Sequence, residues 1–377
     1  MNNPTSMMQV QSTTQNDEVL DVRIVNADMP ALRDSDVLVR IEAAPINPSD
    51  LGLLFGPADM DNAQYSSDSV SPSIKAPIPP HLMSGIEGRI DQSLPVGNEG
   101  AGIVVAAGES EEAQALIGKV VGFSGGGTYS EYKSVRANQC IEMPEGTSPA
   151  QSASCFVNPM TVLGFVGTMR REGHSAMVHT AAASNLGQML QKVAIEESFD
   201  LVNIVRSKEQ EDILRNIGAT FVCNSSSESF LPELTEALVT TGATLGFDAT
   251  GGGRLASDIL ACMERAAVSQ DAAFSRYGST VHKQVYIYGG LDRNVTTLNR
   301  SFGMAWGIGG WLLTPYIQIA GAEELQKMRD RVSGSITTTF ASSYTKEVSL
   351  TDALSKAAVD EYRKQATGLK FLINPSL

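Results

Sequence analysis

The chain has 377 residues, of which 42% are hydrophobic and 19% are charged. These values are close to those of folded globular proteins, so they exclude a disordered or collagen-like chain, and the length suits two or three domains. Asp and Glu number 42 against 28 Lys and Arg, which gives a net charge of −14. Because such an acidic chain repels phosphate backbones, we expect no nucleic-acid partner.

The four cysteines stand far apart and form no Cys-x-x-Cys pair: Cys140, Cys155, Cys223 and Cys262. Scattered single cysteines are typical of buried thiols in a reducing compartment rather than of a zinc lobe or a redox site. Residues 1–21 are polar and acidic, without the basic and apolar regions of a secretory signal. We therefore expect a cytoplasmic protein.

The N-terminal third predicts an all-β region. Short apolar or alternating stretches are separated there by Pro, Gly, Asn and Asp, at 19–25, 36–44, 100–108, 119–124 and 128–135. In the midst of these stretches, residues 57–95 are irregular and rich in Ser, Asp and Pro. A structureless stretch of this length in a compact domain is usually functional or mobile.

From about Ser175 the pattern changes to strands that alternate with helices of ten or more residues. The predicted strands are 175–181, 201–205, 219–223, 243–249 and 283–290. This alternation is typical of βαβ units, so it predicts a doubly wound parallel sheet with helices on both faces. His179 lies in the first strand and is interpreted as a core histidine. Farther on, the pattern is mixed and includes a predicted strand at 338–344.

The first strand of this sheet is followed by a turn of small residues, Thr180 to Gly187. It is not a Gly-x-Gly-x-x-Gly sequence, but small residues at a strand-to-helix turn let the backbone approach a pyrophosphate, and the helix N-terminus favours an anion. Ser184 or Asn185 is suited to cap the helix, and Gly187 to allow close packing. The alternative is a packed turn without a ligand.

Arg206 follows the second strand, at the position where an NAD site usually has an acid for the ribose hydroxyl. A guanidinium group binds a 2′-phosphate well, and Ser207 and Lys208 come directly after it. This pattern favours NADPH over NADH. The alternative is a solvated arginine at the start of a helix.

Residues 301–322 carry no charge and include both tryptophans of the chain. The stretch is long enough to span a membrane, but it contains five glycines and Pro315. We expect a buried or interface segment and no membrane span.

The motifs together resemble the medium-chain dehydrogenase/reductase superfamily over nearly the whole chain, and its zinc-free NADPH:quinone oxidoreductase-like branch in particular. The small-residue turn belongs to this set, and the other motifs appear in the family's order: Ile46–Asp50 (INPSD), Gly97–Gly100 (GNEG), Tyr129–Tyr132 (YSEY), Asp248–Gly251 (DATG) and Tyr288–Gly290 (YGG). Each motif is moderately specific alone, and the ordered set is strong.

The resemblance implies an α/β fold with two domains and a coenzyme in the cleft. A GroES-like β domain is made from both chain ends, residues 1–157 and 318–377, and a Rossmann doubly wound parallel-sheet domain takes residues 158–317. The resemblance implies that Thr161 reaches the nicotinamide, the alternative being an ordinary helix cap, and Lys370 aligns with a basic residue that the family aims at the pyrophosphate. The expected coenzyme-binding residues are Asn47, Thr161, Ala183, Ser184, Asn185, Leu186, Gly187, Arg206, Ser207, Lys208, Thr250, Gly251, Tyr288, Gly289, Gly290 and Lys370.

The resemblance also predicts that no metal is used. Zinc-dependent members of the superfamily place Cys where Asn47 stands and His where Asn98 stands, and a neutral amide is a poor zinc ligand. Glu99 is interpreted as a buried, hydrogen-bonded structural acid rather than a catalytic base.

The INPSD and GNEG motifs also look like those of 2-enoyl thioester reductases. Those enzymes use a tyrosine shortly after the first motif, at a position that falls near Ala58 here. Tyr65 could substitute only if its loop folds back. The pocket candidates are therefore Asn47, Asp50, Tyr65 and Asn98, with the catalytic residue itself unassigned.

These inferences predict an NADPH-dependent enzyme that transfers a hydride to a quinone or another activated carbonyl or alkene. The alternatives are a 2-enoyl thioester reductase and a non-catalytic NADPH-binding protein. We expect a small-molecule acceptor as partner and, from the superfamily's habit of pairing along the Rossmann sheet edge, a homodimer in which residues 301–322 take part. Residues 57–95 are interpreted as a lid or pocket wall that sets acceptor choice.

Overall fold

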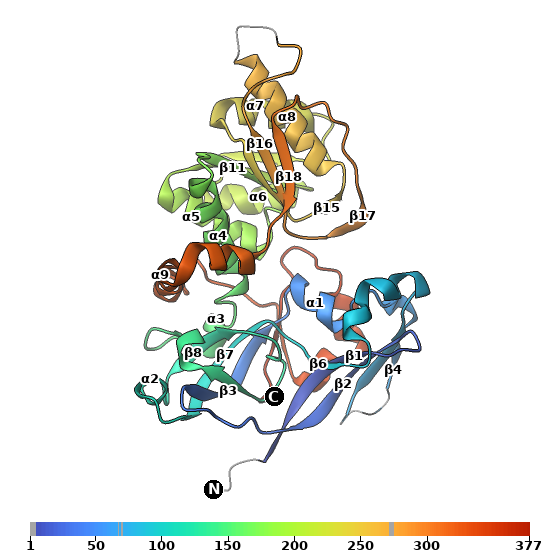
Figure 1. The fold of residues 1–377 in the computed structure, drawn as a ribbon, viewed down its shortest axis with the longest axis vertical. Coiled ribbons are helices and arrows are strands. Elements are labelled where there is room, and N and C mark those ends of the chain that lie inside the picture. Colours follow the sequence, from blue (N-terminus) through green and yellow to red (C-terminus); the bar gives the residue numbers. More distant parts are fainter. Residues whose placement is uncertain (1–4, 67, 69–70, 271–274) are drawn as a thin grey trace. The chain divides into compact units, whose positions relative to one another are not determined.

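The computed structural model describes residues 5–66, 68, 71–270 and 275–377. The chain divides into two compact units: unit 1 is Met1–Val157 with Arg329–Leu377, and unit 2 is Asn158–Met328 (Figure 1). The sequence places the second domain limit at 317/318, whereas the compact units divide at 328/329, inside helix α9 (Leu313–Gly334).

Unit 1 contains two β-sheets. The first has the strand order β4-β5-β2-β1-β6, and the second β10-β8-β7-β3-β20-β19, with β9 also paired to β3. The bounds of the strands are β1 Ser6–Thr14, β2 Val19–Asp28, β3 Asp36–Pro45, β4 Gln64–Tyr65, β5 Ser73–Pro77, β6 Ser93–Pro95, β7 Glu99–Ala107, β8 Val120–Ser124, β9 Tyr132–Arg136, β10 Ile141–Glu142, β19 Lys346–Val348 and β20 Phe371–Ile373.

The C-terminal end of the chain completes the second sheet. Strand β20 pairs antiparallel with β3, which places Leu372 opposite Pro45. Short helices close unit 1: α1 Pro48–Leu54, α2 Glu111–Gln114, α3 Pro149–Ser152, α10 Leu350–Ala353 and α11 Lys356–Tyr362. Alternating apolar residues of β1, β2 and β3 form its core together with residues of α10 and α11.

Residues 57–95 are more regular than the sequence predicts. They contain β4, β5 and β6 and the 3₁₀ segments Met60–Asn62 and Pro80–Arg89. Ile74 and Ile78 are buried in the core, at 0% and 2% exposure, because β5 pairs with β2 inside the first sheet. These strands have only two to five residues and are bounded by prolines or loops, so their alternation was too short to recognise.

Unit 2 is built on a six-stranded parallel sheet: the sequence predicts a parallel sheet with five of these strands, and β18 is an addition. Its order is β13-β12-β11-β14-β16-β18, so the winding reverses between β11 and β14. The strands are β11 Ala176–His179, β12 Asp200–Val205, β13 Phe221–Asn224, β14 Leu245–Asp248, β16 Lys283–Ile287 and β18 Trp306–Gly310, with a separate pair, β15 Gly251–Gly253 and β17 Asp292–Thr296.

Helices surround this sheet (Figure 1): α4 Val157–Arg171, α5 Asn185–Glu197, α6 Lys208–Ile217, α7 Phe230–Thr241 and α8 Leu255–Ser269. Their ends carry the expected signals. The Ser207 hydroxyl accepts a bond from the Gln210 N–H at the start of α6, and Gly218, with φ of 101°, ends that helix.

Residues 301–322 form the edge strand β18 and the first turns of α9. Trp311 and Tyr316 pack against Gly164 and Gly167 of α4, where an added Cβ would lie 2.8 Å and 1.9 Å from their side chains. Of the helices in the described part of the chain, none combines the length and the apolar character that crossing a bilayer requires.

The predicted strand at 338–344 is wrong. Turns follow α9 there, and the strand that pairs with β20 is β19, at Lys346–Val348. Phe340 is fully buried as part of a turn, so its apolar character reflects core packing and not strand alternation.

Candidate functional site

The predicted coenzyme residues of unit 2 follow the carboxyl ends of four neighbouring strands. The turn Thr180–Gly187 follows β11, Arg206 follows β12, Thr250 follows β14, and Tyr288 follows β16. Because parallel strands end at the same edge of a sheet, these segments share one edge of unit 2. Thr161 lies apart from them in sequence, in α4, where it is 7% exposed.

The turn after β11 brings the backbone close to the start of α5. Ser184 caps this helix, and its Oγ accepts the N–H of Gly187 at 3.2 Å. A Cβ on Gly187 would lie 2.1 Å from the carbonyl oxygen of Ala182, so only glycine fits there. Ala181 has a positive φ of 49°. The turn is therefore a tightly wound approach to a helix N-terminus, which is the arrangement that receives phosphate groups.

Asp248 organises the neighbouring loop. Its Oδ1 accepts bonds from the Thr180 hydroxyl at 2.7 Å and from the Thr250 N–H at 2.9 Å, and its Oδ2 accepts the Gly251 N–H at 3.1 Å. Asp248 is fully buried. The carboxylate thus fixes the turn after β11 and the loop after β14 in one arrangement.

The loops after β14 and β16 come into close contact at two glycines. A Cβ on Gly251 would lie 2.5 Å from the carbonyl oxygen of Gly289, and a Cβ on Gly289 would lie 2.5 Å from that of Ala249. Gly251 also has a positive φ of 77°. These glycines are required by close packing between the loops after β14 and β16.

Arg206 is exposed, and its guanidinium group forms no ion pair with any residue that the structure describes. Its backbone N–H donates to Gln210, and its carbonyl oxygen accepts the Ser226 hydroxyl at 2.9 Å. Lys208, in contrast, lies 2.8 Å from a carboxylate oxygen of Asp212. Of the two cations, Arg206 is the one available to an added anion.

His179 is buried in β11, as predicted, and its Nε2 lies 2.7 Å from the Tyr288 hydroxyl. Burial lowers the pKa of His179 to about 3, so the ring is neutral at ordinary pH. Phe165 of α4 packs edge-on against Tyr288 at 4.8 Å between ring centroids. The hydrogen bond with His179 and the packing of Phe165 fix the position of Tyr288 at the start of the Tyr288–Gly290 segment.

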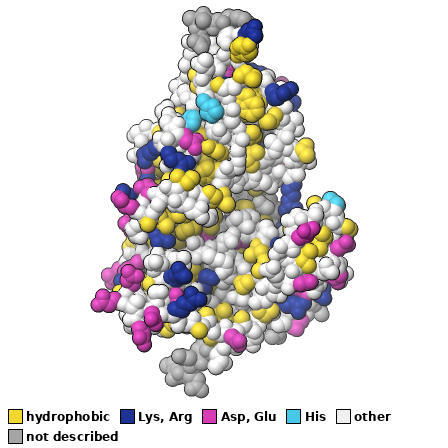
Figure 2. Space-filling view, in the orientation of Figure 1, with side chains coloured by type: hydrophobic (Ala, Val, Ile, Leu, Met, Phe, Trp, Pro, Cys, Tyr) yellow, Lys and Arg dark blue, Asp and Glu magenta, His cyan; other side chains and the backbone are white. Residues whose placement is uncertain are grey.

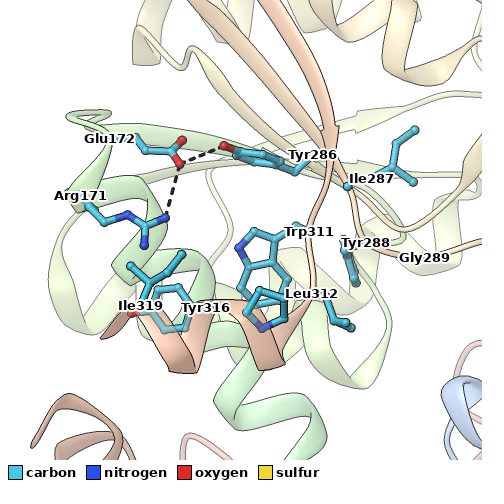
Figure 3. A pocket seen from close by; sticks show the side chains of 12 residues that line it. Arg171, Glu172, Tyr286, Ile287, Tyr288, Gly289, Trp311, Leu312, Tyr316 and Ile319 are labelled. Atoms are coloured by element: carbon cyan, nitrogen blue, oxygen red, sulfur yellow. Dashed lines mark hydrogen bonds and ion pairs between the residues drawn. The ribbon is translucent and has the colours of Figure 1, made fainter. Parts of the chain in front are cut away.

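A hollow of about 430 Å³ lies beside Tyr288 and Gly289 (Figure 3). Aromatic side chains of Tyr286, Trp311 and Tyr316 form much of its wall. At one end Glu172 accepts a bond from the Tyr286 hydroxyl at 2.9 Å and lies 3.6 Å from Arg171. Figure 2 shows hydrophobic side chains grouped on this part of unit 2, where Leu312 and Ile319 are each 64% exposed.

In unit 1, the structure brings Asn47, Asp50 and Asn98 together around α1. Asn47 precedes α1, and its N–H donates to Oδ2 of Asp50 at 2.8 Å. Its side-chain amide donates to Oε1 of Glu99 at 2.8 Å, while the amide of Asn98 donates to the Ser49 hydroxyl at 3.2 Å. Asn, Pro, Ser and Asp are also common turn residues, and here the Asn47–Asp50 segment forms part of a polar cluster as well.

Glu99 is a buried, hydrogen-bonded acid, as the sequence predicts. Its Oε2 accepts the N–H groups of Phe156 and Val157, both at 2.8 Å. Because Val157 begins α4, the carboxylate caps the N-terminus of that helix. Glu99 therefore joins α1, through Asn47, to the start of α4.

Tyr65 is not brought into this cluster. It lies on β4, where the Lys356 ammonium of α11 stands 5.8 Å from its ring centre, and its buried hydroxyl has no partner among the described residues. Burial raises the pKa of Tyr65, and the Asp360 carboxylate adds to the rise.

Lys370 joins the cluster in a way that sequence reasoning missed. Its ammonium donates to the Ser154 hydroxyl at 2.7 Å, and that hydroxyl lies 2.9 Å from the hydroxyl of Tyr344. The Tyr344 ring centre is 5.5 Å from the ammonium. Ser154 and Tyr344 belong to no motif of the sequence, so no signal pointed to them.

The ionisable groups of this cluster are perturbed towards neutrality. Burial raises the pKa of Asp50 to about 7, and the Glu99 carboxylate adds to the rise. Burial lowers the pKa of Lys370 to about 8, against the opposing effect of Glu99 and Asp50. Burial also raises the pKa of Glu99, which Lys370 partly offsets. Such perturbed groups cluster at functional sites more often than elsewhere.

Among the described residues there is no group of three or more His, Cys, Asp or Glu side chains arranged to hold a metal ion. At the two positions discussed above, Asn47 and Asn98 use their amide N–H groups in hydrogen bonds. An amide nitrogen that donates in this way is not a metal ligand.

Residues 33–145 match the family model of the alcohol dehydrogenase GroES-like domain. The mitochondrial enoyl-[acyl-carrier-protein] reductase of Mus musculus is 26% identical over 218 residues, which are 56% of this chain and 51% of that protein. Prostaglandin reductase-3 of Bos taurus is 28% identical over 203 residues, or 53% of this chain and 45% of that protein. The chain spans about half the length of the curated relatives that it matches.

Solved structures match the whole fold. A protein of Mesorhizobium loti described as an NADPH:quinone reductase is 25% identical, with a TM-score of 0.74 and full coverage of both chains. The Escherichia coli quinone oxidoreductase, solved in complex with NADPH, has a TM-score of 0.69 at 19% identity and covers 98% of this chain and 100% of its own. The latter similarity concerns the fold alone.

A GroES-like β unit combined with a unit built on a Rossmann-type parallel sheet defines a class of two-domain oxidoreductases, and the predicted fold class is confirmed. The chain resembles the medium-chain dehydrogenase/reductase superfamily and its quinone reductase-like branch, because residues 33–145 match the GroES-like domain and the Mesorhizobium loti protein matches the whole fold at 25% identity.

Proposed function

We propose that this protein is a zinc-free oxidoreductase that uses NADPH to reduce a quinone or another activated carbonyl or alkene. The observation that carries the proposal is the carboxyl edge of the unit 2 sheet. A tight small-residue turn leads there into α5, and the next strand along the edge is followed by Arg206, which has no ion-pair partner among the described residues. These are the parts that a dinucleotide with a 2′-phosphate requires.

The residues present fit the coenzyme. Residues 183–187 would hold the pyrophosphate, Arg206 and Ser207 the 2′-phosphate, and the glycines at 251, 289 and 290 would admit the rest of the molecule without a side-chain obstacle. When bound, NADPH supplies a hydride from its nicotinamide ring. The chain's own contribution is to fix the turn through Asp248 and to hold a neutral His179 behind Tyr288.

The polar cluster around Asn47 is the candidate acceptor pocket. The Lys370 ammonium, one of whose N–H groups donates to Ser154, suits a carbonyl oxygen that gains negative charge during reduction. No metal step is required by this arrangement, because polarisation by hydrogen-bond donors replaces a Lewis acid.

The second candidate, a 2-enoyl thioester reductase, is favoured by the mouse enoyl reductase relative. The position of Tyr65 against α11 argues against the tyrosine that the motif resemblance assigns to such enzymes. A non-catalytic NADPH-binding protein is the third reading, because a fold and a coenzyme site do not prove turnover.

Two measurements separate these functions. Fluorescence titration gives the dissociation constants of NADPH and NADH, and steady-state NADPH oxidation is followed with a panel of quinones and with crotonyl-type thioesters. We expect tight NADPH binding and turnover with quinones or enones. Turnover confined to thioesters would favour the second candidate, and binding without turnover the third.

The same proposal includes a homodimer that uses the edge strand β18. It also includes a cytoplasmic location and a small-molecule acceptor as the only other partner.

A further inference from the structure

The Lys370 ammonium has unused hydrogen-bonding capacity inside a polar cluster. Within the described chain, its hydrogen-bond acceptor is the Ser154 hydroxyl, so two of its three N–H donors are free for another acceptor. Oδ1 of Asp50 is buried and likewise has no partner among the described residues. A buried cluster with both a free donor and a free acceptor is incomplete without a polar ligand.

The cluster lies beside the residues expected to border the nicotinamide. Asn47, the residue of the first motif, is hydrogen-bonded to Glu99, and Glu99 and Asp50 are the carboxylates that act on Lys370 electrostatically. Both carboxylates act on the ammonium through space, and within the described structure its hydrogen bond goes to the Ser154 hydroxyl. Lys370 is therefore near negative charge without being neutralised by a direct bond.

We propose that Lys370 is the proton donor of the reduction: its ammonium binds the carbonyl oxygen of the hydride acceptor and protonates that oxygen when the acceptor is reduced. This inference rests on the proposed function. It differs from the pyrophosphate role that the resemblance implies for the same residue, because it directs the ammonium to the acceptor and not to the coenzyme.

The step balances in atoms and electrons. One Nζ–H bond breaks and one O–H bond forms on the acceptor, and the electron pair of the broken bond stays on Nζ, which becomes a neutral amine. The two electrons that reduce the acceptor come from the reduced nicotinamide of the proposed function. A quinone leaves as the hydroquinone, and an enone leaves as an enol that isomerises in water.

The cluster also offers a path by which a proton can return to the neutral Lys370 amine. The Ser154 hydroxyl accepts from Lys370 and lies at hydrogen-bond distance from the half-buried Tyr344 hydroxyl. A proton can return along this chain of hydroxyls. Burial, which lowers the pKa of Lys370 to about 8, makes the ammonium a better acid than an exposed lysine.

Two substitutions test the proposal. Lys370→Met removes both the charge and the proton, whereas Lys370→Arg keeps a cation and hydrogen-bond donors but cannot give up a proton at ordinary pH. We expect kcat to fall by about 10² to 10⁴-fold in both variants, the usual contribution of a general acid. The NADPH dissociation constant should stay within a few-fold of the wild type.

The pH profile supplies the second readout. Three titratable groups act on Lys370 or contact it, namely Asp50 of α1, Glu99 of β7 and Tyr344. Wild-type kcat should fall as the pH rises through about 8, and this loss should be absent from both variants. The protein without coenzyme gives a third readout: the rate of reductive methylation of Lys370, measured by peptide mass spectrometry, should rise near pH 8 and not near pH 10.

Each result decides between readings. A Lys370→Arg enzyme with wild-type kcat and pH profile overturns the proposal alone, because charge would then suffice. Weakened NADPH binding that accounts for the whole loss of kcat/KM assigns Lys370 to the pyrophosphate and also overturns it. A wild-type protein that binds no NADPH overturns the proposed function and this inference together.

Discussion

The Thr180 hydroxyl donates to Oδ1 of Asp248 at 2.7 Å, and the same hydroxyl accepts the N–H of Ala249 at 2.8 Å. Both residues are fully buried. A single side chain thus joins the carboxyl ends of β11 and β14, the two strands between which the winding of the sheet reverses. This is the place at which open α/β sheets bind their ligands.

Thr180→Val should therefore destabilise unit 2. The substitution leaves a buried carboxylate oxygen without one of its donors, which costs about 1–3 kcal/mol. Chemical denaturation measures the loss, and Thr180→Ser, which keeps the hydroxyl group, is the matched control. Equal stability of the valine and serine variants would show that the bond does not hold the two strand ends together.

Arg206→Ala should weaken NADPH binding by about 1–3 kcal/mol, the contribution of a charge-assisted hydrogen bond. NADH, which lacks the 2′-phosphate, should bind almost as before. Titrations with both coenzymes measure the difference, and Lys327→Ala removes an exposed cation of unit 2 as the control for net charge. If NADPH and NADH weaken equally, Arg206 has a structural role.

Chelators should leave the activity unchanged. The amide groups of Asn47 and Asn98 donate hydrogen bonds and provide no anionic or imidazole ligand. Activity is compared before and after prolonged incubation with a strong zinc chelator, with elemental analysis of the purified protein. About one firmly held zinc ion per chain would contradict this prediction.

The sequence predicted the parts of the site that lie close together in the chain. The turn after β11 and Arg206 after β12 could be placed because a strand and a helix of ordinary length set their spacing. Glu99, inside the GNEG motif, lies at the start of β7 and is buried and hydrogen-bonded as expected. The positions of these residues follow from the local pattern, whereas the coenzyme roles of the turn and of Arg206 stay predictions.

The remaining parts depend on contacts between distant residues. Lys370 meets Ser154, which is 216 positions earlier in the chain, and nothing in either local sequence indicates this pairing. Arg89 is a second case: its guanidinium donates to the carbonyl oxygen of Leu53 at 2.9 Å and to the Ser12 hydroxyl at 3.0 Å. It thereby satisfies an end of α1 from within the segment that the sequence predicted to be irregular.

Residues 57–95 therefore contribute to the core of unit 1, which a lid that only covers a pocket would not do. Deleting their middle third would remove β5 together with the buried Ile74 and Ala76. We therefore expect such a deletion to prevent folding, and acceptor choice is better tested at exposed positions such as Leu82.

His179 should make the protein sensitive to acid. Its pKa falls from about 6.5 in an unfolded chain to about 3 in the folded one, so between these values the unfolded state binds more protons. Stability then decreases as the pH falls below about 6.5, by up to about 1.4 kcal/mol per pH unit from this group. In His179→Gln this part of the slope should disappear, whereas His81→Gln, at an exposed position, should keep it. Unfolding measured between pH 4 and 7 decides the matter, and parallel slopes for wild type and His179→Gln would contradict the assignment.

The last prediction concerns the free edge of β18. The backbone N–H of Trp311 donates to the carbonyl oxygen of Ile287, and the backbone N–H of Lys283 donates to the carbonyl oxygen of Ala305. The odd-numbered residues of this stretch therefore bond to β16. The N–H of Ile308 must then point to the free side of the edge strand, where a second copy of β18 can pair with it.

Ile308→Pro removes this donor without breaking the ladder to β16. Sedimentation velocity at micromolar concentration should show a dimer for the wild type and a monomer for Ile308→Pro, with the same circular dichroism spectrum. A wild-type monomer, or a proline variant that still forms the dimer, would show that the edge of β18 is not the subunit contact.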